Sequence, residues 1–154
     1  MDEAALIETV GEALEGMRTV RLRLPARAQY IALARLTLSG LADTAAVSDE
    51  LLADLKLALT EAVSNSVRHA YPGGSGSVSI VYELTGEALA VEVVDDGAGF
   101  DPDRLQPLLE GEELAEGGLG IAIIRTIADE FELQSQPGVR GSRVRFVKRL
   151  RPPD

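Results

Sequence analysis

The sequence contains no cysteine, a single histidine and no excess of basic residues. Disulfides, thiol catalysis and cysteine-bound zinc are therefore excluded, and one histidine cannot build a multi-histidine metal site. The 15 Lys and Arg residues stand against 25 Asp and Glu residues, which gives a net charge of −10. This balance argues against direct binding of nucleic acid, because phosphate contacts demand a basic surface.

Long apolar runs and a basic N-terminal region are also missing. No run approaches the ~18 apolar residues of a membrane span, and the acidic start lacks the basic segment of a signal peptide. The 154 residues, 45% hydrophobic and 26% charged, are typical of one globular domain with its own core. We therefore expect a cytoplasmic protein that does not bind membranes.

Hydrophobic periodicity divides the chain into an appendage and one domain. Apolar residues at helical spacing predict an N-terminal helix in residues 1–17, which either packs on its own domain or contacts a partner. The domain spans residues 18–154 and contains both strands and helices. Strands are expected over 19–24, 77–84, 88–94, 130–136 and 142–148, and helices over 26–39, 48–70 and 119–129.

The order of these elements predicts the fold class. Two alternating strands joined by Thr85-Gly86-Glu87 favour an antiparallel hairpin. The whole order favours an α+β two-layer sandwich, in which a mixed, mainly antiparallel sheet carries the helices on one face.

The longest predicted helix carries the first candidate site. Glu61, Asn65 and His69 are four residues apart, so they share one stripe of the helix surface. Such a stripe can be a solvated face. It can also place a carboxylate and an amide in a cleft, where the carboxylate accepts a proton and the amide oxygen binds Mg²⁺.

The second candidate site follows the strand at 88–94. Asp95 comes first, and Gly97 and Gly99 provide backbone that can approach a ligand closely. The motif is either an ordinary Asp-Gly turn or an acceptor for the amino group of a ligand. Since side chains alternate along a strand, only one of Asp95 and Asp96 can face such a site.

The third candidate is the glycine-rich start of the last helix, Gly117-Gly118-Leu119-Gly120. Backbone N–H groups at a helix N-terminus bind phosphate readily. The motif has no following lysine, so it is not a phosphate loop of the GxxxxGK[ST] type. A flexible start of a helix is the other interpretation.

Together the three motifs resemble the GHKL ATP-binding superfamily of gyrase, heat-shock chaperone, histidine kinase and MutL type. The helix motif looks like the N box, the strand-end motif like the G1 box, and the glycine-rich motif like the G2 box. Within the superfamily, three segments resemble bacterial anti-sigma factor serine/threonine kinases, namely EAVSNSVRHAY, VVDDGAGFDP and EGGLGIAIIRTIADE. The resemblance covers residues 19–150 and implies the Bergerat ATP-binding fold, with ATP and Mg²⁺ bound.

The resemblance also implies roles for single residues. Glu61 would be the catalytic base for an incoming serine hydroxyl, Asn65 would bind Mg²⁺, and Asp95 would accept from the adenine amino group. The other nucleotide-binding positions would be His69, Gly97, Gly99, Gly117, Gly118, Leu119, Gly120 and Ser142. Residues 101–116 would form a lid, and the cation that meets the γ-phosphate stays open among Arg68, Arg104 and Arg125.

The implied function is that of a serine kinase in a stress-response pathway of transcription regulation. It would phosphorylate an anti-anti-sigma factor, sequester a sigma factor and form a homodimer. A catalytically silent ATP-binding regulatory module is the alternative. A histidine-kinase ATP module is disfavoured, because the sequence offers no phosphoacceptor helix pair and its only histidine lies in the N box.

Overall fold

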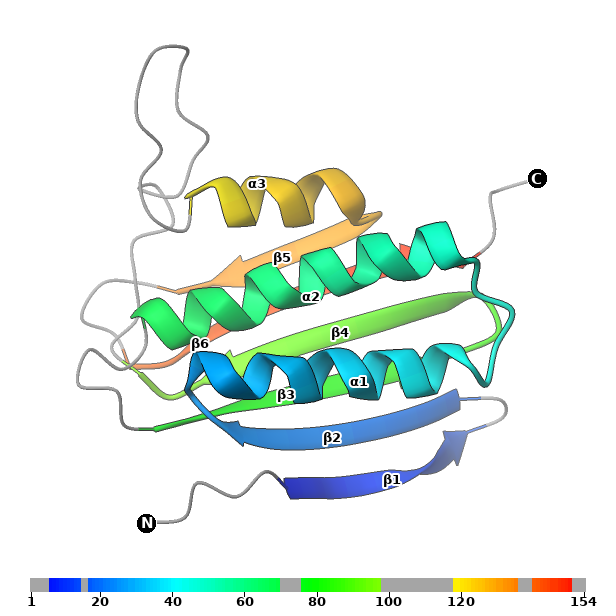
Figure 1. Cartoon of the computed structure of the whole chain (residues 1–154), viewed down its shortest axis with the longest axis horizontal. Coiled ribbons are helices and arrows are strands. Elements are labelled where there is room, and N and C mark those ends of the chain that lie inside the picture. Colours follow the sequence, from blue (N-terminus) through cyan, green and yellow to red (C-terminus); the bar gives the residue numbers. More distant parts are fainter. Residues whose placement is uncertain (1–5, 15–16, 70–75, 98–117, 136–139, 151–154) are drawn as a thin grey trace.

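The computed structural model describes residues 6–14, 17–69, 76–97, 118–135 and 140–150. They form one sheet with a layer of helices over one of its faces (Figure 1). The strands are β1 (Leu6–Leu14), β2 (Met17–Pro25), β3 (Ser77–Leu84), β4 (Ala88–Asp95), β5 (Glu130–Gln134) and β6 (Ser142–Arg149). The helices are a 3₁₀ turn (Ala28–Tyr30), α1 (Ile31–Ala42), α2 (Asp49–His69) and α3 (Gly118–Ile127).

The sheet has six strands in the order β1-β2-β3-β4-β6-β5. Every pairing between described strands is antiparallel, so the parallel part of the expected mixed sheet is not found among them. The helices α1, α2 and α3 lie side by side over the same face (Figure 1). The prediction of a two-layer α+β sandwich is therefore confirmed, and so is the hairpin of β3 and β4.

The predicted N-terminal helix is wrong for residues 6–14, which form β1. This strand pairs with β2 from Leu6 opposite Arg23 to Leu14 opposite Met17, with register shifts after Ile7 and after Glu12. Without it, the outer edge of β2 would leave backbone N–H and C=O groups unpaired. The segment also contains Gly11 and β-branched residues, which weaken a helix and suit a strand. The helical spacing of its apolar residues was therefore a weaker signal than the free sheet edge.

The long helix α2 is the main cover of the sheet. Ser48 caps its start by accepting a hydrogen bond from the Leu51 N–H at 3.1 Å, and two acidic residues in the first turn suit the helix dipole. Its apolar stripe is fully buried against the sheet and comprises Leu55, Ala58, Leu59, Ala62 and Val63. Because this stripe fixes the rotation of α2, it also fixes the directions of the polar residues further along the helix.

The core between the two layers is largely apolar, and Tyr82 adds a polar link across it. The buried Tyr82 of β3 donates a hydrogen bond to the Ala34 carbonyl of α1 at 2.8 Å, and burial raises the pKa of the phenol well above its ordinary value. No described helix is both long enough and apolar enough to cross a bilayer.

We predict opposite outcomes for two leucines of α2. Leu59 is completely buried, whereas Leu57 is 44% exposed. Leu59→Ala leaves a cavity between helix and sheet and should lower the free energy of unfolding by about 2–5 kcal/mol. Leu57→Ala serves as the matched control and should change it by less than about 0.5 kcal/mol. Urea unfolding measures both, and equal losses would contradict this orientation of α2.

Candidate functional site

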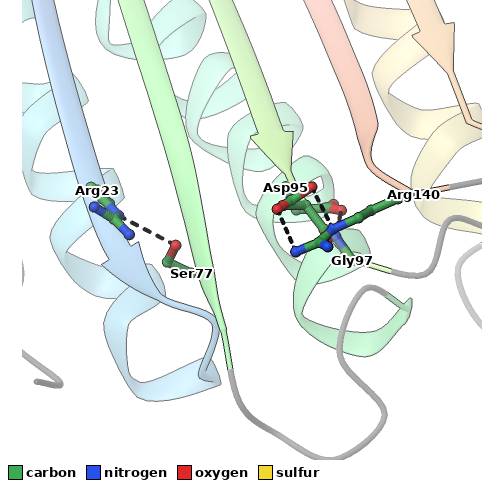
Figure 2. Close-up of polar contacts among 6 residues, drawn as sticks. Arg23, Ser77, Asp95, Gly97 and Arg140 are labelled. Atoms are coloured by element: carbon green, nitrogen blue, oxygen red, sulfur yellow. Dashed lines mark hydrogen bonds and ion pairs between the residues drawn. The ribbon is translucent and has the colours of Figure 1, made fainter. Parts of the chain in front are cut away.

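The Asp95 carboxylate lies at the end of β4, where it is buried. One oxygen, Oδ2, accepts hydrogen bonds from Ser66 Oγ of α2 at 2.7 Å and from Ser142 Oγ of β6 at 2.6 Å. The other oxygen, Oδ1, accepts from the Gly97 N–H at 3.0 Å (Figure 2). Three donors from three segments therefore hold this carboxylate in one orientation.

These contacts leave Asp95 able to accept one more hydrogen bond. A carboxylate offers about four acceptor positions, and the described donors occupy three. A ligand amino group is a donor of the kind that the remaining position would accept. Asp95 thus has the burial, fixed orientation and spare acceptor capacity of a recognition residue.

Asp96 faces the opposite way. Its side chain is 70% exposed and forms an ion pair at 2.8 Å with Arg140, which is labelled in Figure 2. Only one of the two aspartates is buried here, as strand alternation predicts, and that residue is Asp95. Arg23 and Ser77, also drawn in Figure 2, join β2 to β3 away from this carboxylate.

Asn65 is the second buried polar residue of the site. It is 2% exposed, and neither Oδ1 nor Nδ2 has a hydrogen-bond partner within the described part of the chain. Buried amides are nearly always paired, because an unpaired one loses its contacts with water without replacement. An amide oxygen is a ligand that suits Mg²⁺. Asn65 therefore fits a site that is completed by a bound group.

Glu61 lies one helical turn before Asn65 and is half-buried. Its side chain contacts Gly120 in the first turn of α3. The structure thus brings the predicted helix motif and the predicted glycine-rich motif together. The Glu61 carboxylate and the Asn65 amide, which has no partner among the described residues, thus follow each other along α2, and Ser66 joins the same helix to Asp95.

The turn after β4 is held from the other side by Gly141. Its N–H donates to the Gly97 carbonyl at 2.7 Å, and its φ of +94° is a conformation that favours glycine. A β-carbon there would also lie 3.4 Å from the Asp95 carbonyl oxygen. Gly141 therefore brings β6 close enough for Ser142 to reach Asp95.

An open groove of about 670 Å³ lies beside this carboxylate, with Asp95, Leu133, Arg140, Ser142 and Arg143 among its lining residues. Hydrogen bonds to Glu132 and Glu92 raise the pKa of Arg143 and keep its guanidinium charged. The groove is thus lined by both acidic and basic groups.

The remaining predicted residues lie outside the described residues or in α2 and α3. Gly99, Gly117, Arg104 and the proposed lid over 101–116 lie outside the described residues. His69 ends α2, and Gly118 and Leu119 begin α3. Arg68 is exposed, whereas Arg125 lies over the Phe131 ring at 5.1 Å from its centroid. Among the described residues, no group of three or more His, Cys, Asp or Glu could hold a metal.

Sequence reasoning missed two residues of this site. Ser66 donates a hydrogen bond to Asp95, and Gly141 donates one to the turn after it. In the sequence alone, however, they are an ordinary helix serine and an ordinary loop glycine. Ser66 follows Asn65 directly, which was the one available signal. Its contact with a residue 29 positions later required the tertiary structure.

Comparisons with known proteins show the family of this chain. Residues 24–148 match the histidine kinase-like ATPase domain family. The chain is 35% identical over 139 residues to the serine-protein kinase RsbW of Staphylococcus epidermidis. The aligned region covers 84% of this chain and 87% of the RsbW chain. It is also 35% identical over 147 residues to RsbW of Bacillus pumilus, covering 89% and 91% of the two chains.

A solved structure supports the fold alone. The RsbU and RsbW domains of Rv1364c from Mycobacterium tuberculosis match with a TM-score of 0.60 at 21% identity. The match covers 86% of this chain but 33% of that longer one. The sequence comparisons thus confirm the resemblance to GHKL anti-sigma kinases, and the solved structure agrees with the fold. The chain belongs to the histidine kinase-like ATPase domain family.

Proposed function

We propose that this protein is an ATP-dependent serine kinase and anti-sigma factor. It phosphorylates an anti-anti-sigma factor on serine and sequesters a sigma factor. Relatives named serine-protein kinase, at 35% identity over most of both chains, support the activity. The observation that carries the proposal is Asn65, a buried amide whose two polar atoms have no partner among the described residues.

In this proposal the two buried side chains bind opposite ends of the nucleotide. Asp95 accepts a hydrogen bond from the adenine amino group, since three protein donors already fix its orientation. Asn65 holds Mg²⁺ through its amide oxygen. When bound, Mg²⁺ neutralises charge on the phosphates, which is the main electrostatic requirement of phosphoryl transfer.

Glu61 acts as the general base. The serine oxygen forms a bond to the γ-phosphorus, the bond from that phosphorus to the β–γ bridging oxygen breaks, and ADP leaves. The serine proton passes to the Glu61 carboxylate. Because Glu61 precedes Asn65 by one turn of α2, the base and the metal ligand lie at the same end of the nucleotide.

The proposed partners follow from charge and from the resemblance. The net charge of −10 favours association with a sigma factor, since such proteins carry basic DNA-binding surfaces. A homodimer that acts in the cytoplasm is part of the same proposal.

Asn65→Ala tests the nucleotide site through a separation of stability and binding. Removal of a buried amide that has no partner among the described residues should leave the melting temperature of the free protein unchanged or raised. The same change should weaken Mg·ADP binding by roughly 10- to 100-fold, the value of a hydrogen bond or ligand contact to a charged group. Calorimetry and ligand-induced thermal shifts measure both. A parent protein that shows no shift with Mg·ADP would refute nucleotide binding.

Glu61→Gln tests the catalytic base. The change keeps the shape of the side chain but removes its ability to accept a proton, so phosphate transfer should fall by roughly 10²–10⁴-fold. Nucleotide affinity should stay within a few-fold, because Asn65 and Asp95 are untouched. The assay is transfer of labelled γ-phosphate to the candidate anti-anti-sigma protein encoded by the same cell.

Glu50→Gln is the matched control for that experiment. It removes the same charge from the exposed first turn of α2 and should leave transfer unchanged. Transfer at the parental rate by Glu61→Gln would show that Glu61 is not the base. A parent that binds ATP and phosphorylates no candidate would favour the catalytically silent regulatory module.

A further inference from the structure

Gly120 lies in the first turn of α3, where nothing in the backbone requires a glycine. The residue is buried and helical. Among the described residues, positive φ angles occur only at Gly76 and Gly141. Glycine is also one of the poorest helix formers. Its presence at this position therefore needs an explanation from the space around it.

That space is filled by one side chain. A β-carbon at position 120 would lie 2.6 Å from Glu61 Oε1, and 3.5 Å from both the β-carbon and the δ-carbon of Glu61. These are its three nearest atoms outside the local helix. A separation of 2.6 Å is shorter than carbon–oxygen van der Waals contact allows, so one of the two groups would have to move.

The carboxylate would move rather than the helix. α3 is anchored by Ile121 and Ile124, which are buried in the core between the two layers. Glu61 Oε1 is the free end of a flexible side chain that is only half-buried. Any side chain at position 120 would therefore push the Glu61 carboxylate out of its present position at small cost to the fold.

We propose that Gly120 is a positioning residue for Glu61. The missing side chain leaves the space in which the carboxylate lies, and so α3 determines where the base points. This inference rests on the proposed role of Glu61 as the general base. It differs from a role of Gly120 in binding phosphate, because it acts through Glu61 and leaves nucleotide affinity unaltered.

The consequence for catalysis follows from distance. A general base must come within hydrogen-bond reach of the proton that it accepts, and a misplacement of about 1 Å can cost about 10²-fold in rate. Gly120→Ala should therefore lower phosphate transfer by about 10²-fold. Affinity for Mg·ADP should stay within about threefold, since the change leaves Asn65 and Asp95 intact.

The control is Gly40→Ala in α1. Gly40 is also a helical glycine, but it is exposed and a β-carbon there would meet nothing within 4 Å. It should share the effect of greater helix propensity on thermal stability and leave phosphate transfer unchanged. Gly120→Ala should likewise melt no lower than the parent, which excludes unfolding as the cause of its lower rate.

A double-mutant cycle separates the action through Glu61 from other effects. In the Glu61→Gln background the base is already absent, so addition of Gly120→Ala should cause no further loss of transfer. A further loss of the full size, or a fall in nucleotide affinity as large as the fall in rate, would overturn the inference. Gly120→Ala with parental transfer would also overturn it.

A spectroscopic measurement keeps the inference distinct from the proposed function. The carboxyl carbon of Glu61, observed by NMR in labelled protein and assigned with Glu61→Gln, should change its chemical shift in Gly120→Ala and keep it in Gly40→Ala. No change in Gly120→Ala would overturn the contact itself. A changed shift with full transfer by Glu61→Gln would instead refute Glu61 as the base, and the positioning role would fall with it.

Discussion

The Asp95 carboxylate is the group on which the rest of the site depends. A buried carboxylate is tolerated only when donors replace its water, and here they come from α2, from β6 and from the turn after β4. The sheet register sets Asp95 directly opposite Ser142. Ser66 then ties α2 to the same point, so that its neighbour Asn65 is also held at this end of the sheet. One charge thus fixes three elements against one another.

Two residues of α2 show how the fold and the site impose different demands. Ser66 has its hydrogen bond within the protein, whereas the adjacent Asn65 is equally buried and has none among the described residues. A sequence selected for stability alone would place an apolar residue at position 65, as at Ala62 and Val63. The amide at position 65 is therefore informative, because among the described residues it forms no hydrogen bond that would stabilise the fold.

The limits of prediction from sequence are visible in the same residues. The hairpin of β3 and β4 and the opposite directions of Asp95 and Asp96 depend on neighbours in the chain or on strand alternation, and these local signals were sufficient. The choice of Asp95 as the site residue came from the family resemblance. β1 was missed because a free sheet edge outweighed the local periodicity of residues 6–14. The Ser66 hydrogen bond and the contact of Glu61 with Gly120 join distant segments. No spacing within either motif contains that information, and only the assembled layers bring these groups together.

The packing of α2 also divides the site into two mechanically different ends. On one side its apolar stripe and Ser66 fix it to the sheet, so Asp95 and its donors have no freedom to rearrange without disturbing the core. On the other side Glu61 meets α3 through a carboxylate against a bare glycine backbone, a contact with no interlocking side chain at Gly120. Close-packed cores transmit displacement, whereas a contact of this kind yields to it. Any adjustment that accompanies binding would therefore be concentrated in the Glu61 side chain where it meets Gly120, while the Asp95 carboxylate stays fixed by its three donors.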